Sequence, residues 1–263
     1  MMNRVNHNLK EVRQRIVQAC AAAGRPVHSV CLLAVSKTFD TDAVRQALAA
    51  GQHAFGENYV QEALDKISAL ADLRSQIDWH LIGPLQSNKT RAVAAAFDWV
   101  HSVDRLKIAL RLSEQRPAGL PPLQVCLQVN ISGQASKSGL LPDAVLAVAR
   151  AVALLPNLRL RGLMAIPEPA EGEPAQRAPH RALRELLGAL NAAGLGLDTL
   201  SMGMSADLEA AVAEGATVVR VGTAIFGGRV KAPDALPPTP LRLDPTGPLT
   251  AADIEAAIAA GRA

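Results

Sequence analysis

The sequence predicts an α/β protein folded as a single (β/α)8 barrel of the TIM type, with one extra helix at its N-terminus. Apolar runs alternate with amphipathic segments along residues 7–227, as in proteins whose strands are joined by helices. The runs are almost continuously apolar, which is typical of parallel strands buried on both faces. There are eight of them, the number that closes this kind of barrel. An open doubly wound sheet is the alternative, and it is disfavoured because no GxGxxG motif follows the first run.

An amphipathic helix is expected first, over residues 7–23. Leu9, Val12, Ile16 and Cys20 recur at helical spacing, and a Gly-Arg-Pro run directly afterwards ends the helix. Because this helix precedes the first strand, it is additional to the repeating units of the barrel.

Strands and helices then follow each other in strict order. The expected strands lie at 30–37, 53–58, 77–83, 99–103, 123–131, 158–166, 197–203 and 217–227. The expected helices lie at 41–50 and 59–71, from Lys89, from Asp104, near Pro142, through Leu183 to Leu190, and from Ser205. Thr41, Asp104 and Ser205 are expected as N-caps, and Pro142 suits a first helical turn.

The barrel is expected to occupy residues 1–229 as one domain. Residues 230–263 are a Pro-rich C-terminal extension without periodicity, typical of a linker or ordered coil. Within this extension, residues 250–260 could form a short helix. The extension is too short to form a second domain with its own core.

Composition narrows the class of protein. Hydrophobic residues make up 49% of the chain and charged residues 19%, which suits a soluble globular protein, and aromatics at 3% imply an aliphatic core. The net charge of +3 comes from scattered basic residues, which argues against nucleic-acid binding. No apolar run is long enough to cross a membrane and no signal core is seen, so a cytoplasmic protein is expected. Three widely spaced cysteines indicate reduced thiols and no metal site.

A lysine at the end of the first strand is the first candidate for chemistry, because functional residues of such barrels lie at the carboxyl ends of the strands. Lys37 directly follows a buried run. Partial desolvation would lower the pKa of its ammonium, and a neutral amine is the nucleophile that forms imines. The alternative is a lysine whose charged end simply reaches solvent.

The second and third strands also end in polar residues. Asn58 follows a Gly-Glu pair and offers a bidentate amide, or it caps the next helix in an ordinary turn. His80 lies inside an apolar run, so we interpret it as a hydrogen-bonded core histidine instead of a catalytic base.

Small residues and hydroxyls gather at the ends of the seventh and eighth strands. Ser201, Met202 and Ser205 belong to the first group, and Gly222 and Thr223 to the second. Many barrels bind a phosphate there through backbone N–H groups, although tight turns with capping hydroxyls would look the same. The first and eighth strands are neighbours in a closed barrel. A phosphorylated aldehyde such as pyridoxal 5′-phosphate (PLP) would fit between this phosphate cup and Lys37.

Several motifs spread over residues 5–229 carry a family resemblance. They are AVSKT at 34–38, FGENYVQE at 55–62, WHLIGPLQSNK at 79–89, SKSG at 136–139, RGLMAIP at 161–167, SMGMSADLEAA at 201–211 and VRVGTAIFG at 219–227. Together they resemble the pyridoxal phosphate homeostasis (PLP-binding) protein family, related to the N-terminal barrel of alanine racemase. The resemblance implies a barrel like that of fold-type III PLP proteins. The C-terminal extension is longer than the pattern of this family.

The resemblance also implies roles for single residues. It implies that Lys37 carries PLP as a Schiff base, that Asn58 lies beside the cofactor and that Arg220 lies near the pyridine nitrogen. It implies a phosphate held by Ser201, Gly222 and Thr223, assisted by the amides near Met202 and by a helix starting at Ser205.

Function follows from the same resemblance. A cationic arginine at the ring nitrogen disfavours its protonation and so weakens the cofactor as an electron sink. Racemases of this fold use a second acid or base, a tyrosine that an added domain contributes. The only tyrosine here is Tyr59, which belongs to the motif after the second strand. We therefore expect a non-catalytic PLP carrier that acts in vitamin B6 homeostasis in the cytoplasm. We expect it to be a monomer and to contact apo PLP-enzymes only transiently. A PLP-dependent amino-acid racemase-like enzyme is the main alternative, and a Schiff-base aldolase acting on a phosphorylated sugar is a third.

Lys137 remains open between two interpretations. It lies in a loop after the fifth strand, where a solvated lysine would be unremarkable. Alternatively, it swings over the site and competes for the aldehyde during cofactor transfer.

Overall fold

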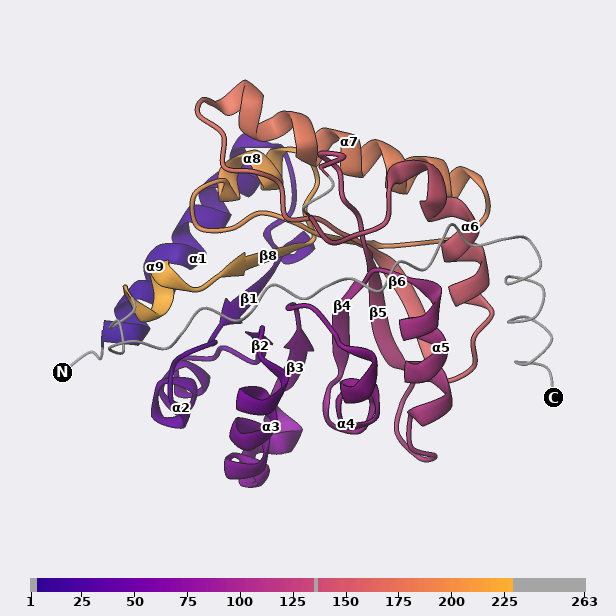
Figure 1. The fold of residues 1–263 in the computed structure, drawn as a ribbon. Coiled ribbons are helices and arrows are strands. Elements are labelled where there is room, and N and C mark those ends of the chain that lie inside the picture. The colour runs from indigo at the N-terminus through magenta and orange to yellow at the C-terminus, as the bar shows by residue number, and fades with distance from the viewer. Residues whose placement is uncertain (1–3, 135–136, 229–263) are drawn as a thin grey trace.

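Eight parallel strands close into a barrel in this computed structural model, which describes residues 4–134 and 137–228 (Figure 1). They are β1 (Cys31–Val35), β2 (Ala54–Glu57), β3 (Asp78–Leu81), β4 (Trp99–Val103), β5 (Leu123–Gln128), β6 (Leu158–Met164), β7 (Thr199–Ser201) and β8 (Val218–Val221). The strands follow one another in chain order, and β8 pairs with β1 to complete the circle. The predicted single barrel is therefore confirmed, and the open sheet is excluded.

Helices surround the barrel on its outside. They are α1 (Arg4–Ala22), α2 (Thr41–Ala49), α3 (Val60–Ala69), α4 (Thr90–Ala96), α5 (Leu106–Gln115), α6 (Pro142–Ala153), α7 (Glu173–Ala192), α8 (Leu208–Ala213) and α9 (Thr223–Phe226). Short 3-10 turns lie at η1 (Val27–Ser29), η2 (Ala71–Gln76) and η3 (Ser87–Lys89).

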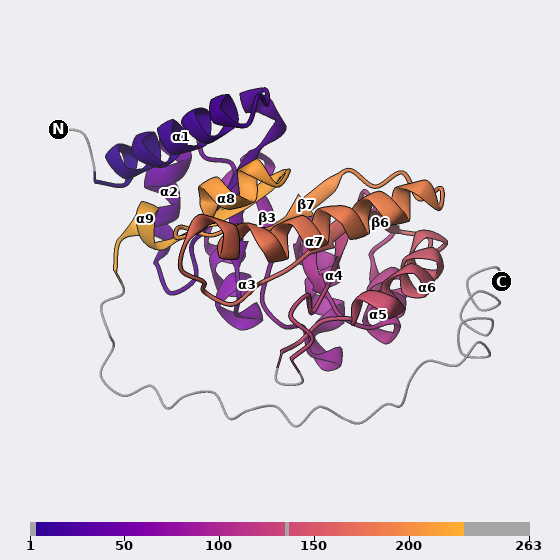
Figure 2. The ribbon, with the colours of Figure 1, turned by 90° about the horizontal axis from the view of Figure 1, so that it is seen from above.

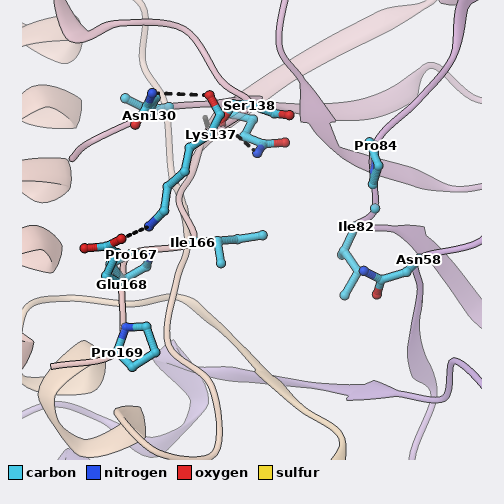
Figure 3. A pocket seen from close by; sticks show the side chains of 13 residues that line it. Asn58, Ile82, Pro84, Asn130, Lys137, Ser138, Ile166, Pro167, Glu168 and Pro169 are labelled. Carbon is cyan, nitrogen blue, oxygen red and sulfur yellow. Dashed lines mark hydrogen bonds and ion pairs between the residues drawn. The ribbon is translucent and has the colours of Figure 1, made fainter. Parts of the chain in front are cut away.

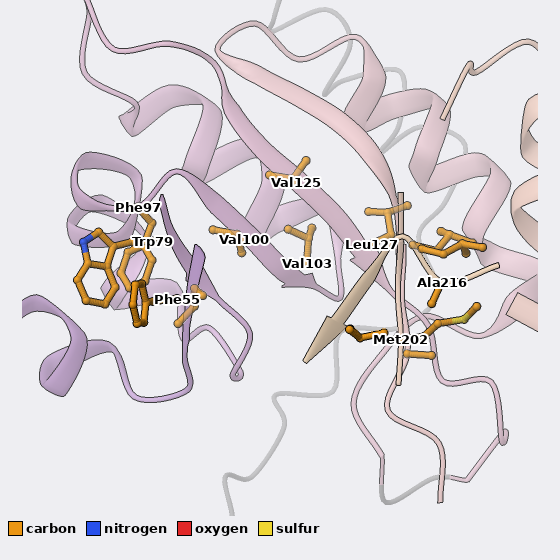
Figure 4. Packing of buried hydrophobic residues seen from close by; sticks show 14 of the residues in the cluster. Phe55, Trp79, Phe97, Val100, Val103, Val125, Leu127, Met202 and Ala216 are labelled. Carbon is orange, nitrogen blue, oxygen red and sulfur yellow. The ribbon is translucent and has the colours of Figure 1, made fainter. Parts of the chain in front are cut away.

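The core is aliphatic, as the composition predicts. Val100, Val103, Val125 and Leu127 are fully buried (Figure 4). Aromatic rings gather instead on β2, β3 and the end of α4, where the rings of Phe55 and Trp79 lie with centroids 5.9 Å apart. Such interiors are close-packed, so the strand ends are held in fixed relative positions.

The extra N-terminal helix is confirmed and packs outside the barrel against α2, α8 and α9 (Figure 2). It buries the predicted apolar stripe, including Leu9 and Ile16. The side-chain amide of Asn8 donates to the carbonyl of Ile225 at 2.8 Å. This helix therefore supports the segment that follows β8.

Several predicted helix starts need correction. The N-cap of α2 is Asp40, whose carboxylate accepts from the amide of Ala43, because Thr41 already lies in the first turn. Asp104 does not cap α5, since it precedes the N-cap residue and pairs with Arg105 at 2.8 Å. The start at Pro142 is confirmed.

The segments around strands seven and eight also differ from expectation. Ser205 does not cap α8, because a turn intervenes and Asp207 takes the N-cap position. The expected strand and loop at 217–227 contains the short helix α9 directly after β8. The predicted extension at 230–263, with its helix at 250–260, lies outside the described residues.

Candidate functional site

Lys37 lies half-buried on a tight turn directly after β1. The amide of Phe39 donates to the carbonyl of Ser36 at 3.1 Å and closes this turn. Thr38 adopts a φ of +67°, a left-handed conformation that is uncommon for a β-branched residue. The lysine therefore stands on a strained segment whose shape must be held by its surroundings.

Charged side chains from β2 and α3 hold this turn. The ammonium of Lys66 donates to the carbonyl of Ser36 at 2.7 Å and to carboxylate oxygens of Glu57 at 2.8 Å and Glu62 at 2.6 Å. The amide of Thr38 donates to Glu62 at 2.6 Å. Sequence reasoning missed Lys66 and Glu62, because on a helix they look like an ordinary exposed i,i+4 pair.

The segment after β8 lies beside this turn, as the closed barrel requires. Ala34 pairs with Val221, and a Cβ placed on Gly222 would lie 3.0 Å from the carbonyl oxygen of Val35. The backbone amides of Gly222 and Thr223 donate to no acceptor in the described part of the chain. Two N–H groups without a protein acceptor, next to the Lys37 turn, are suited to an anion.

Arg220 lies inside the mouth of the barrel and is 4% exposed. Its guanidinium donates to the hydroxyl of Ser201 at 2.8 Å and to the carbonyl of Ala165 at 2.8 Å. Burial lowers the pKa of Arg220 to about 10, which still leaves it charged at neutral pH. The guanidinium is thus fixed by two neighbouring strands.

A chain of hydrogen bonds continues from Ser201 across the barrel. One ring nitrogen of His101 lies 2.7 Å from the hydroxyl of Ser201, and the other lies 2.9 Å from His80. Burial lowers the pKa of His80 to about 3 and that of His101 well below its usual value, so both imidazoles are neutral. The interpretation of His80 as a core histidine is confirmed. His101 was missed, because it lies inside the fourth strand and its hydrogen-bond partners come from other strands.

The predicted phosphate ligands at the end of β7 and in the loop after it differ in burial. Ser201 and Met202 are buried, and the amide of Met202 already donates to the carbonyl of Val218. Ser205 is half-buried in the turn before α8. Asp207 orders that turn by accepting from the amide of Met204 at 2.6 Å and pairing with His180 at 2.9 Å. A phosphate contact stays a prediction for all three predicted residues of this loop.

Asn58 lines a cavity of roughly 420 Å³ at the mouth of the barrel (Figure 3). Its side-chain oxygen is buried and finds no hydrogen-bond partner in the described part of the chain. A Cβ on Gly83 would lie 2.1 Å from the Asn58 carbonyl oxygen, so only glycine allows this approach of the two strand ends. The predicted alternative of Asn58 as a helix cap is wrong, since Tyr59 holds that position.

Lys137 lies on the opposite wall of this cavity (Figure 3). Its ammonium lies 3.8 Å from a carboxylate oxygen of Glu168. The arrangement is compatible with either interpretation of this lysine. Among residues 4–134 and 137–228, no group of three metal-ligating side chains is found, and no helix is long and apolar enough to cross a membrane.

The structure therefore brings together most of the residues that the sequence singles out. Lys37, Arg220, Gly222 and Thr223 lie on the adjacent ends of β1 and β8, and Asn58 follows β2. A lysine next to amides without a protein acceptor, with a fixed guanidinium at the mouth of a (β/α)8 barrel, is the arrangement expected of barrels related to alanine racemase. Accordingly, residues 2–230 match the family model of the alanine racemase N-terminal domain.

Curated relatives specify the family further. The chain is 64% identical over 228 residues to the pyridoxal phosphate homeostasis protein of Pseudomonas aeruginosa, covering 87% of this chain and 97% of that protein. It is 52% identical over 229 residues to the protein of the same name from Escherichia coli, covering 87% and 98%. The chain belongs to the pyridoxal phosphate homeostasis protein family.

Solved structures agree with this assignment. PipY of Synechococcus elongatus, determined with PLP bound, is 38% identical with a TM-score of 0.74, covering 85% of this chain and 100% of that chain. Alanine racemase from Corynebacterium glutamicum is 18% identical with a TM-score of 0.63, covering 88% of this chain and 63% of that one. The latter similarity shows the shared fold alone.

Proposed function

We propose that this protein binds PLP as a Schiff base on Lys37 and serves PLP homeostasis and carriage in the cytoplasm, without catalytic turnover. The observation that carries the proposal is the position of Lys37 beside the unsatisfied amides of Gly222 and Thr223. A relative with 38% identity has been determined with PLP bound, which supports the same ligand here.

The residues present fit such a group. Gly222 leaves space at the strand end that a Cβ would crowd, and its amide is a free donor for phosphate oxygens. The buried, unpartnered oxygen of Asn58 indicates a polar ligand at the mouth. We assign phosphate binding to Gly222, Thr223 and Ser205, with Ser201 and Met202 supporting this wall from the barrel interior.

PLP supplies an aldehyde that condenses with amines and a pyridine ring that can withdraw electrons. The protein controls the second property through Arg220. Its guanidinium is held by Ser201 and Ala165 and remains charged, and a cation there would disfavour protonation of the ring nitrogen. A weak electron sink favours storage of the cofactor over carbanion chemistry.

The lack of turnover is supported by the candidate proton-transfer groups. His80 is buried and bonded to His101, and burial depresses its pKa to about 3. Tyr59 is 48% exposed at the start of α3. His80 therefore lacks the poised pKa that a general acid or base requires, and Tyr59 lacks an enclosed position. A racemase would exchange the α-proton of an amino acid with deuterium at enzymic rates, and that result would promote the enzymatic alternative.

Borohydride reduction followed by peptide mass spectrometry tests the binding proposal. The expected product is a pyridoxyl group on the peptide that contains Lys37. A sugar-derived adduct on the same lysine would indicate the aldolase alternative, and an unmodified Lys37 would contradict covalent binding.

Carriage requires release as well as binding. We expect the loaded protein to restore activity to an apo PLP-enzyme faster than free PLP does at the same concentration. Contact with such enzymes is proposed to be transient, and the protein itself to be a monomer. Sedimentation of the loaded protein, alone and with the apo-enzyme, measures both properties. The free thiols of Cys20, Cys31 and Cys126 suit a reducing cytoplasm.

A further inference from the structure

Glu57, Glu62 and Lys66 form an ion cluster beside the turn that carries Lys37, and the proposed function does not account for it. Because only Glu62 is partly exposed, we call it the buried ion cluster. Lys66 is 6% exposed although it carries an ammonium group. Its three N–H donors are all used, one on a backbone carbonyl and one on each carboxylate. All donors of Lys66 are therefore satisfied, and the position of its ammonium group is fixed by three acceptors.

The cluster contacts the chain on both sides of Lys37. On one side, Lys66 donates to the carbonyl of Ser36 at 2.7 Å, and the Ser36 hydroxyl donates to Glu57 at 2.7 Å. On the other side, the amide of Thr38 donates to Glu62 at 2.6 Å. The backbone before and after Lys37 is thus tied to the same three side chains.

The shape of the turn needs this support. Among the described residues, only Thr38 and Asn157 combine a side chain with a positive φ, and asparagine tolerates that conformation far better than threonine does. A strained conformation persists only where its surroundings fix it. The bond from the Thr38 amide to Glu62 is the contact that acts on the strained residue itself.

A contribution to the stability of the folded protein is a poor explanation for the presence of the buried ion cluster. Removing charges from water costs free energy that a buried ion pair often fails to recover, and apolar replacements are commonly as stable. Burial raises the pKa of the Glu57 carboxyl, and Lys66 opposes that rise. The second oxygen of Glu57 is buried without a hydrogen-bond partner in the described part of the chain. Such an arrangement is better suited to fixing a geometry than to adding stability.

We propose that the buried ion cluster is a positioning device that holds the turn carrying Lys37 so that its amine is presented to PLP in one orientation. The inference rests on the proposed function. Glu57, Glu62 and Lys66 contact the neighbours of Lys37, and we therefore regard them as positioning residues.

The sharpest test uses Glu62, whose side chain is 30% exposed and can be replaced without emptying the core. Glu62→Ala removes the acceptor of the Thr38 amide, whereas Glu62→Gln keeps an oxygen there. We expect Glu62→Ala to slow the appearance of the visible PLP band by roughly tenfold or more, because small misplacements of reacting groups cost that much or more. Glu62→Gln should restore most of the native rate.

Asp72→Ala is the matched control. It also removes a carboxylate from an ion pair, with Arg45 at 3.0 Å, but makes no bond to the Lys37 turn. Its PLP binding rate should equal that of the native protein. If Glu62→Ala and Asp72→Ala bind PLP at the native rate and lose only thermal stability, the cluster is merely structural and the inference is wrong.

Hydrogen exchange separates this inference from the proposed function. In the absence of PLP, Glu62→Ala should speed exchange of the Thr38 amide, and Glu62→Gln should do so much less. If the native protein never binds PLP, both the proposed function and the positioning role are wrong. Unchanged exchange at Thr38 would overturn the inference even if PLP binds.

Discussion

Ser201 and Thr223 both carry hydroxyls near the predicted phosphate cup, but their environments differ. Ser201 is fully buried between Arg220 and His101, whereas Thr223 is exposed at the start of α9. We expect Ser201→Ala to lower the free energy of unfolding by about 1–3 kcal/mol, because it leaves buried polar groups unpaired. Thr223→Ala should change stability by less than about 0.5 kcal/mol, as exposed substitutions do, and weaken PLP binding.

Urea denaturation and PLP titration of the two variants check this difference. The reverse pattern, with Thr223→Ala destabilised and Ser201→Ala intact but unable to bind, would mean that Ser201 meets the phosphate directly.

His80 makes stability depend on pH. Its pKa is about 3 in the folded protein, against an ordinary value of 6.5, because burial disfavours the charged ring. Between pH 6.5 and 3 the unfolded chain is therefore protonated at this histidine, whereas the folded protein is not. The free energy of unfolding is highest above pH 6.5 and falls as the pH is lowered toward 3. From pH 7.5 to 5.5 this histidine should cost about 1.4 kcal/mol.

His80→Asn tests this dependence, since the asparagine amide can replace the ring nitrogen that faces His101. Chemical denaturation of both proteins at the two pH values should show a smaller loss for the variant. Equal losses would show that His80 does not titrate between the two states.

At the scale of elements, two glycines that read alike in the sequence have opposite roles. Gly83 follows β3 and touches Asn58, where a Cβ would lie 2.1 Å from a carbonyl oxygen. Gly188 lies exposed within α7, and a Cβ there would meet nothing within 4 Å. We expect Gly83→Ala to destabilise the protein and weaken PLP binding, because the strand ends must separate.

Gly188→Ala should instead stabilise the protein by about 0.5–1 kcal/mol, the usual gain from alanine within a helix. Thermal unfolding of both variants measures the contrast. A Gly83→Ala protein with native stability and affinity would show that the mouth tolerates movement of these strands.

The strands were predictable and the helix starts were less so. Parallel strands such as β1 and β8 are buried on both faces, which leaves an apolar run that is visible in the sequence. A cap depends on which of two adjacent polar residues bonds the first turn, and at α2 Asp40 prevailed over Thr41. The two choices of N-cap differ by one residue, and sequence patterns do not locate a helix start to within one residue.

At the scale of the whole molecule, the candidate site was predictable only in part. Lys37 and Gly222 follow buried strands, so the barrel rule locates them. Lys66 and His101 could not be found that way, because their importance comes from partners 30 and 100 residues distant in the chain, Ser36 and Ser201. Ser201 stays a predicted phosphate ligand, but its position in the sequence could not reveal that Arg220 and His101 bond its hydroxyl.

The proposed binding unit is residues 1–229, and the matches to curated relatives cover nearly all of those proteins but only 87% of this chain. A truncated protein that ends at residue 229 should therefore bind PLP with the same affinity as the full chain. Titration of both forms measures this. A weaker truncated protein would give the extension a part in binding.

The central claim is that Lys37 holds PLP covalently at the mouth of the barrel. The most direct measurement is the absorbance spectrum of the purified protein after PLP is added, compared with Lys37→Ala and with Lys107→Ala, a lysine of α5, as the control. We predict a visible band in the native and control proteins that is absent from Lys37→Ala. A native protein that stays colourless, or a Lys37→Ala protein that keeps the full native band, would contradict the claim.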